Sequence, residues 1–188
     1  MKIKWKKWVL LLIVFVLLLN TTTIARVFYP VKYMNYIKES CEMYQVDPYL
    51  IMSIIKSESN FKKDAVSRKN ATGLMQIMEP TAYWLAERNG LSGFDYENIT
   101  DPAINIQLGC SYVAYLLELY DGDEKNALAA YNAGEGTVSR WLSDPKCSND
   151  GKTLHYIPYP ETRHYIRQVS ANKKVYTWLY EVRSAVIV

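Results

Sequence analysis

A single carboxylic acid, Glu58, is placed where burial would prepare it for acid catalysis. It lies at the end of a short predicted helix that begins with Asp47 at the N-cap and Pro48 at the first helical position. The apolar face of this helix consists of Leu50, Ile51, Ile54 and Ile55. Glu58 follows the last two of these by four and three residues, so it continues the face that should be buried. Burial disfavours the carboxylate and raises the pKa, which keeps a proton available for general acid catalysis. The alternative is a helix-end glutamate that turns into solvent.

Three further clusters combine glycine, small residues and polar side chains in a way that is unusual for the interior of a helix. They are Gly73-Leu74-Met75-Gln76-Ile77, Ala130-Tyr131-Asn132-Ala133-Gly134 and Glu161-Thr162-Arg163-His164-Tyr165. In the first cluster Gly73 allows close backbone approach, and the Gln76 amide offers a donor and an acceptor. In the second, the Tyr131 hydroxyl can reach a carboxyl group. Each cluster alone has an ordinary structural explanation, such as a glycine that ends a helix. Together with Glu58 they indicate a site.

These clusters, with the run Glu58-Ser59-Asn60-Phe61, resemble the catalytic domain of the soluble lytic transglycosylases (the SLT domain, family 1 lytic transglycosylases) in order and approximate spacing. The match extends over most of the chain, from about Cys41 to Tyr180. The resemblance implies an all-α fold like that of goose-type lysozyme. It also implies that the substrate is bacterial peptidoglycan, and that the bond cut is the β-1,4 bond between N-acetylmuramic acid and N-acetylglucosamine. Glu58 would be the only catalytic acid and base.

The resemblance also assigns substrate-binding and supporting positions. These are Ser67, Met75, Gln76, Tyr131, Asn132, Glu161 and Tyr165. Ser67 falls where the family has a hydroxyl that helps to orient the substrate, and Met75 and Gln76 fall in the wall of the cleft. The chain departs from the family pattern at Glu79, which stands before the expected proline. This departure affects the shape of the rim and leaves the chemistry unchanged.

Glycosidic cleavage ordinarily uses two carboxyl groups, roughly 5–5.5 Å apart in retaining enzymes and about 6.5–9.5 Å apart in inverting ones. The other candidate acids do not lie on an apolar face as Glu58 does, so a mechanism with one carboxyl fits better; they are Asp64, Glu79, Glu135 and Glu161. The resemblance supplies this mechanism. Glu58 protonates the leaving oxygen and then deprotonates the C6 hydroxyl, which closes onto C1 to give a 1,6-anhydromuramic acid product. This is carbon–oxygen lyase chemistry, with no cofactor. Tyr131 would donate a hydrogen bond to the acid, with Glu161 and Tyr165 in a supporting shell.

Two other functions are left open. A hydrolytic muramidase would use water activated by a second carboxyl, such as Asp64 or Glu161, and would give a reducing-end product. A catalytically silent module that binds the cell wall would keep the fold without turnover. The presence of Glu58, Gln76 and Tyr131 argues against the silent module, because a decayed enzyme has no need of an acid on a buried face.

The elements that position these residues are predicted to be helices. Helical periodicity and Asp-Pro starts indicate one all-α domain over residues 33–183. The predicted helices span residues 33–44, 47–58, 79–89, 101–120, 123–133, a short segment ending near 142, and 161–183. The one candidate for β structure is a loop or small ribbon at residues 66–73. Trp84, Trp141 and Trp178 fall at helical spacing and are expected in the core, although the many aromatic residues also suit a cleft for sugars.

The first 25 residues form a separate segment. Four lysines precede an apolar run from Trp8 to Leu19, and the stretch from Trp8 to Ala25 has 18 residues. A helix of this length is about 27 Å long, near the minimum for a membrane span. We expect an uncleaved, single-pass membrane anchor with the domain outside the cytoplasm. A signal peptide cut after Ala25, which would release a secreted protein, is the alternative.

Charge and cysteine content exclude several kinds of partner. The chain has a net charge of +3, but four lysines and Arg26 carry five of the positive charges, which leaves −2 on the remainder. A nucleic-acid-binding surface is therefore not expected. Cys41, Cys110 and Cys147 have no CxxC spacing, so any disulfide pairing is left open, and the first two suit a core. The two histidines stand apart from any cysteine, and no metal site is expected.

Overall fold

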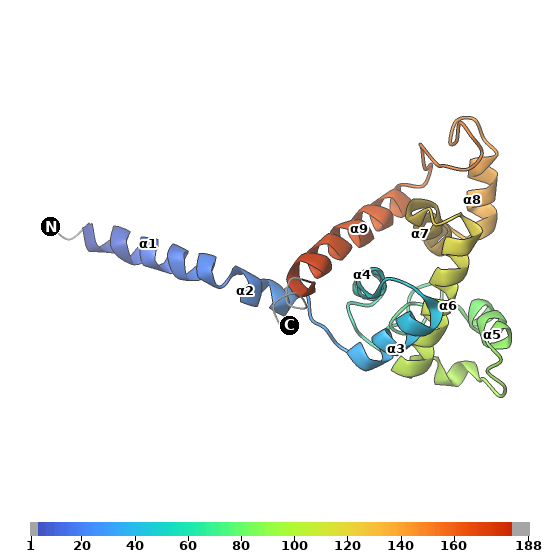
Figure 1. The fold of residues 1–188 in the computed structure, drawn as a ribbon, viewed down its shortest axis with the longest axis horizontal. Helices are drawn as coiled ribbons and strands as arrows, with labels where there is room; N and C mark the ends of the chain where they lie inside the picture. The colour runs from blue at the N-terminus through green and yellow to red at the C-terminus, as the bar shows by residue number, and fades with distance from the viewer. Residues whose placement is uncertain (1–3, 182–188) are drawn as a thin grey trace.

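The computed structural model describes residues 4–181, and this part of the chain is helical with no β-sheet (Figure 1). Its elements are α1 (Lys4–Leu19), α2 (Thr21–Phe28), α3 (Met34–Tyr44), α4 (Pro48–Glu58), α5 (Glu79–Arg88), the 3-10 helix η1 (Tyr96–Thr100), α6 (Pro102–Leu119), α7 (Glu124–Ala133), α8 (Glu135–Leu142) and α9 (Pro160–Tyr180). Isolated bridges join Val66 to Thr72 and Thr72 to Ile77. The all-α prediction is confirmed, and residues 66–73 form a loop with single bridges.

Aspartates begin three helices, as the sequence predicts. Asp47, Asp101 and Asp123 each accept hydrogen bonds from backbone amides in the first turns of α4, α6 and α7. Such a cap stabilises a helix by about 1 kcal/mol. The sequence did not predict η1, and the predicted end of the last helix at residue 183 lies outside the described residues.

The helix that ends at Glu58 lies within the core of the domain. The side chains of Ile51, Ile54 and Ile55 in α4 are all 0% exposed. Helix α9 packs along α4, and α3 packs on α6 (Figure 1). Because α4 is enclosed by its neighbours, its last turn is held in a fixed position. Each fully buried isoleucine contributes roughly 1.5–3 kcal/mol to this packing.

The prediction for the three tryptophans is right for one of them. Trp141 is 8% exposed and lies in the core with α7 and α8, as expected. Trp178 is 53% exposed and Trp84 is 37% exposed, so both are at the surface. Helical spacing places a residue on a face of its helix but does not say whether another element covers that face.

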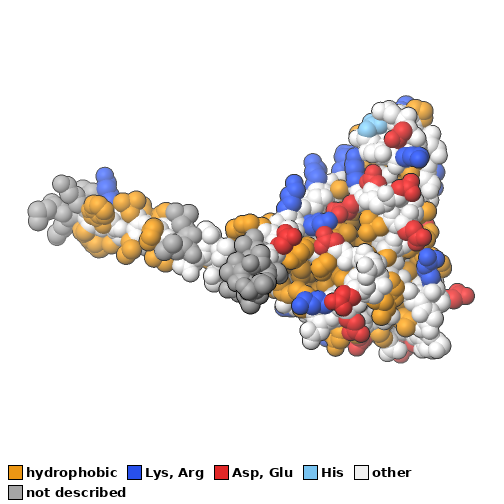
Figure 2. Space-filling model, in the orientation of Figure 1, with side chains coloured by type: hydrophobic (Ala, Val, Ile, Leu, Met, Phe, Trp, Pro, Cys, Tyr) orange, Lys and Arg blue, Asp and Glu red, His pale blue; other side chains and the backbone are white. Residues whose placement is uncertain are grey.

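The N-terminal hydrophobic segment forms two helices rather than one. Helices α1 and α2 meet at Asn20, and Figure 2 shows hydrophobic side chains exposed over α1. Among the described residues, no single helix has the length and hydropathy of a membrane span. Lys7–Val16 and Thr21–Phe28 meet that criterion only as a pair, and their axes differ by 61°.

The segment that follows α1 packs against the end of α9. Arg26 donates from Nη2 to the Leu179 carbonyl at 3.0 Å, and its guanidinium lies 5.5 Å from the centre of the Tyr180 ring. The Tyr180 hydroxyl donates to the Tyr29 carbonyl at 2.7 Å. Residues before the predicted domain start at residue 33 therefore pack against α9.

All three cysteines are buried as free thiols. Cys41 in α3 is 5% exposed and Cys110 in α6 is 0% exposed, which confirms that they are core residues. Burial raises the pKa of the Cys110 thiol, as does the neighbouring Cys41. Cys147 lies in the loop before α9 and is also buried.

Candidate active site

Glu58 is the last residue of α4, and the turn after it is fixed by its neighbours. Ser59 caps the helix, and its hydroxyl donates to the Leu74 carbonyl at 2.8 Å. Asn60 and Phe61 both have left-handed backbone angles, with φ of 50° and 62°. Such angles are uncommon for an aromatic residue, and burial of the Phe61 side chain offsets their cost. The sequence Glu58-Ser59-Asn60-Phe61 therefore builds a rigid support for the carboxyl.

The environment of Glu58 brings the pKa of its carboxyl close to neutral pH. Burial raises the pKa of Glu58 to about 7, and a hydrogen-bonding effect of Tyr165 offsets part of the rise. The carboxyl also lies at the C-terminal end of α4, where the helix dipole disfavours negative charge. No neighbouring carboxylate contributes to the shift. A group with this pKa can give up a proton and take one back at the same pH.

Two tyrosines lie beside the acid, in different roles from those expected. The Tyr131 hydroxyl donates to the Met75 carbonyl at 2.7 Å, so the predicted hydrogen bond from Tyr131 to Glu58 is replaced by one to the backbone. The Tyr165 hydroxyl is buried close to the carboxyl, but it has no partner at full hydrogen-bond geometry among the described residues. The two rings stack with centroids 6.4 Å apart. Tyr165 is thus the hydroxyl that is free to serve Glu58.

The loop with Gly73 and Met75 is held by Asn105, a buried residue of α6. The Asn105 amide oxygen accepts from the Met75 amide at 2.8 Å. Its nitrogen donates to the carbonyls of Thr72 at 3.1 Å and Ile99 at 2.9 Å. A Cβ at Gly73 would lie 2.1 Å from this nitrogen, which explains the glycine. The sequence analysis did not identify Asn105, although a polar residue between Ile104 and Ile106 in a helix is an available signal.

Met75 is placed in the core rather than on the wall of a cleft. Its side chain is 0% exposed, and its sulfur packs against Gly109 of α6. The Gln76 side chain is partly buried, with a backbone φ of 50°. Its amide nitrogen donates to the carbonyls of Ala65 and Gly73, both at 2.9 Å. The Gln76 amide oxygen is the part of this loop that is left to accept a hydrogen bond from a ligand.

The remaining predicted residues are spread around this centre. The Ser67 hydroxyl accepts from the Ala71 amide at 3.0 Å and so stabilises its own loop. The Asn132 amide oxygen accepts from the Thr162 hydroxyl at 2.8 Å, which joins α7 to α9. Glu161 is exposed in the first turn of α9, where its charge suits the helix dipole. The structure does not bring Glu161 into contact with Glu58.

The acids considered as a second catalytic carboxyl are not paired with Glu58. Asp64 is exposed and forms an ion pair with Lys63 at 2.9 Å. Glu135 accepts a hydrogen bond from the Tyr115 hydroxyl at 2.9 Å. A second carboxylate close to Glu58 would raise its pKa by charge repulsion, and no such contribution is present. Among the described residues, no second carboxyl is therefore paired with Glu58.

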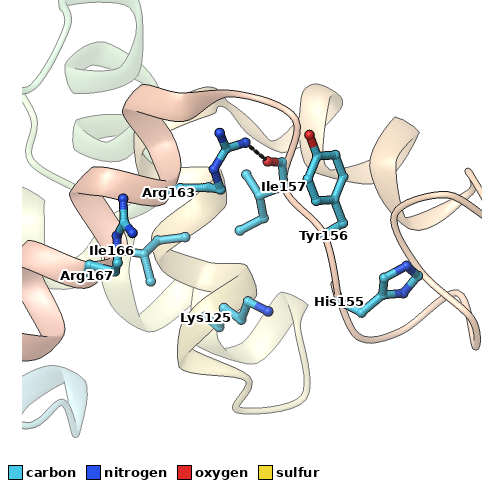
Figure 3. Close-up of a pocket in the computed structure, with 7 residues that line it drawn as sticks. All are labelled: Lys125, His155, Tyr156, Ile157, Arg163, Ile166 and Arg167. Carbon is cyan, nitrogen blue, oxygen red and sulfur yellow. Dashed lines mark hydrogen bonds between the residues drawn. The ribbon is translucent and has the colours of Figure 1, made fainter.

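A cavity of about 210 Å³ lies between α7, α9 and the loop before α9, and Figure 3 shows its lining. The lining residues are Lys125, His155, Tyr156, Ile157, Arg163, Ile166 and Arg167. None of these was predicted to act on a substrate. Arg163 donates to the carbonyls of Ile157 and Pro158 and lies 5.7 Å from the centre of the Tyr156 ring. This arrangement fixes the start of α9, and through it the position of Tyr165.

Potential metal ligands do not gather near the site. Among residues 4–181, no group of three or more histidine, cysteine, aspartate or glutamate side chains is placed to hold an ion. The chemistry that the geometry supports is proton transfer by Glu58, assisted by Tyr165.

Comparison with known proteins identifies the family of this chain. A family model described as "Transglycosylase SLT domain" matches residues 35–153. The structure of an inactive glutamate-to-glutamine mutant of lytic transglycosylase Slt from Pseudomonas aeruginosa is similar with a TM-score of 0.72 and 29% identity, over 81% of this chain and 25% of that one. The 70 kDa soluble lytic transglycosylase SLT70 from Escherichia coli gives 0.71 and 28%, over 80% of this chain and 25% of that one.

A complex of the 70 kDa soluble lytic transglycosylase with bulgecin A is similar to the same degree, with a TM-score of 0.71 and 28% identity. The chain spans 25% of the length of each of these solved structures. The family model, in contrast, covers well over half of the present chain. The chain therefore belongs to the transglycosylase SLT domain family.

Proposed function

We propose that this protein is a peptidoglycan lytic transglycosylase. It cuts the β-1,4 bond between N-acetylmuramic acid and N-acetylglucosamine and releases a 1,6-anhydromuramic acid product. The observation that carries the proposal is the partly buried carboxyl of Glu58, whose pKa is raised by desolvation to about 7 with no second carboxylate paired with it. Membership of the SLT family supports it, as does similarity to solved structures described as lytic transglycosylases, one of them an inactive glutamate-to-glutamine mutant.

In the first step, the Glu58 carboxyl gives its proton to the glycosidic oxygen, and the bond between that oxygen and C1 of the N-acetylmuramic acid breaks. In the second step, the C6 hydroxyl of the same muramic acid attacks C1, and its proton passes to the Glu58 carboxylate. The new bond joins O6 to C1, and Glu58 is again protonated. No water is consumed. A pKa of about 7 suits both steps, because neither protonation state of Glu58 is strongly disfavoured near neutral pH.

Tyr165 and Tyr131 assist Glu58 in different ways. The Tyr165 hydroxyl is buried, lies next to the carboxyl and has no other partner among the described residues, so it can donate to the carboxylate that forms between the two steps. Tyr131 holds the Met75 carbonyl and thereby fixes the loop that carries Gln76. Hydrolysis is the less favoured reaction, because no second carboxylate is paired with Glu58 to activate water.

We also propose that the N-terminal segment holds the domain outside the cytoplasm at the membrane. The lysines before the apolar run and the exposed hydrophobic side chains of α1 support this location. N-terminal sequencing of the protein recovered separately from washed membranes, the medium and the cytoplasm tests this location. A start at Met1 supports the anchor, a start at Arg26 in the medium supports a cleaved signal peptide, and recovery in the cytoplasm contradicts both.

The test of the activity is mass spectrometry of the muropeptides that the full-length chain releases from purified peptidoglycan. We expect products lighter by one water than their hydrolytic counterparts, and none with Glu58→Gln. Reducing-end products would establish a muramidase. Binding to the wall without any product from the wild-type chain would establish a silent binding module.

A further inference from the structure

A series of aromatic rings leads from the acid to the surface of the domain. Tyr131, beside Glu58, contacts Tyr112 of α6 with ring centroids 5.3 Å apart. Tyr112 in turn contacts Trp84 of α5, with centroids 6.2 Å apart, and stacks on Tyr115 at 6.4 Å. Trp84 and Tyr115 meet edge to face at 5.0 Å. We call Trp84, Tyr112 and Tyr115 the aromatic strip. It begins where the candidate active site ends, along the contact between α5 and α6 (Figure 1).

The outer end of the aromatic strip is exposed but firmly held. Trp84 is 37% exposed, and Tyr115 is partly exposed. The Arg88 guanidinium lies 5.9 Å from the centre of the Trp84 ring and 5.1 Å from that of Tyr115. The Tyr115 hydroxyl is fixed by the Glu135 carboxylate at 2.9 Å. A surface of this kind loses little conformational entropy when it binds a ligand.

The composition of the aromatic strip fits a sugar ring. A pyranose presents C–H groups on its faces, which pack on an aromatic ring, and hydroxyl groups around its edge, which need polar partners. Arg88 and Glu135 stand at the sides of the strip and supply donors and acceptors. Folding alone does not require an exposed tryptophan here, since the buried face of α5 consists of Ala82, Leu85 and Ala86.

We propose that Trp84 and Tyr115, with Arg88, bind a pyranose ring of the glycan strand outside the two sugars joined by the bond that is cut. The inference rests on the proposed function for the identity of the strand. Contacts from Tyr131 through Tyr112 to Trp84 connect this subsite to the surroundings of Glu58, and the proposal is that one strand occupies both. A short substrate reaches only the reacting centre, whereas a longer strand also reaches Trp84.

The test measures binding without turnover, by isothermal titration calorimetry on full-length chains that carry Glu58→Gln. The probes are chitohexaose and chitobiose, soluble oligomers of N-acetylglucosamine. We expect Trp84→Ala to weaken chitohexaose binding about tenfold and to leave chitobiose binding unchanged. Trp84→Phe keeps an aromatic face and should restore most of the loss. Trp178→Ala is the matched control, because Trp178 is also an exposed tryptophan, at 53%, but lies on α9 away from the strip.

A second measurement uses the active chain on glycan strands. Trp84→Ala should raise KM while kcat stays within about twofold, because the ring binds the strand and does not touch the reacting atoms. Equal chitohexaose affinity for the parent and Trp84→Ala, or the same loss with Trp178→Ala, would overturn the proposal. If the proposed function were wrong, the products released by the wild-type chain would differ from those expected. The binding measured with the Glu58→Gln chains would not reveal that failure, so the two results are distinguishable.

Discussion

At the scale of the residue, the raised pKa of Glu58 affects the stability of the fold as well as the proposed catalysis. Folding raises the pKa of Glu58 from 4.5 to about 7, so between these values the folded chain binds more protons than the unfolded chain. The free energy of unfolding must therefore fall as the pH rises through this window. The full cost of ionising this partly buried group, present above the window, is roughly 3 kcal/mol.

Glu58→Gln removes this titration. We expect the variant to gain stability relative to the wild type as the pH rises from 4 to 8, by up to about 3 kcal/mol, because the amide has no charge to desolvate. Urea unfolding at several pH values measures the difference. Parallel pH dependences for the two proteins would contradict the assignment of an acid with a raised pKa.

The raised pKa of Glu58 also predicts that kcat/KM of the wild type falls above about pH 7, because the carboxyl must be protonated to act as an acid.

At the scale of the element, the position of the loop with Met75 depends on how closely it approaches α6. A Cβ at Gly109 would lie 2.1 Å from the Met75 sulfur. Gly109→Ala should therefore destabilise the fold by about 1–3 kcal/mol, although alanine is the better helix former. Gly136→Ala in α8 is the control, because the nearest atom to its Cβ would be the Arg140 guanidinium at 3.8 Å.

Gly136→Ala should stabilise the chain by up to about 1 kcal/mol, since it favours the helix and meets no close neighbour. Thermal and urea unfolding of both variants provide the comparison. If Gly109→Ala changed the free energy of unfolding in the same direction as Gly136→Ala, the Met75 side chain would be able to move aside. Activity should fall with Gly109→Ala only, because the Met75 carbonyl is the acceptor for Tyr131.

At the scale of the whole molecule, residues 26–30 join the N-terminal segment to the catalytic domain. Besides the contacts of Arg26 and Tyr29, the Tyr176 hydroxyl donates to the Pro30 carbonyl at 3.1 Å. We predict that a fragment beginning at Lys32 is less stable than one beginning at Arg26 by roughly 3 kcal/mol, from a few hydrogen bonds of about 1 kcal/mol each. Urea unfolding measures this difference. A fragment beginning at Thr21 should match the one from Arg26, and equal stability of all three would show that the packing contributes nothing.

The sequence by itself predicted the α-helices of the domain and identified Glu58 as the candidate acid. Asp47, Pro48 and the isoleucines of α4 define a helix and its buried face through local capping and a period of 3.6 residues, and both signals can be read within one segment. The family resemblance added the clusters that surround Glu58. These inferences needed no knowledge of which helix packs on which.

Only the tertiary structure decided which side chains lie beside Glu58 and which ones support the surrounding loops. It gave Tyr165, rather than Tyr131, the free hydroxyl beside Glu58, and it placed Met75 in the core. It also left Trp84 exposed. Side-chain partners depend on contacts between segments far apart in the chain, and local periodicity carries no information about which neighbour covers a given face.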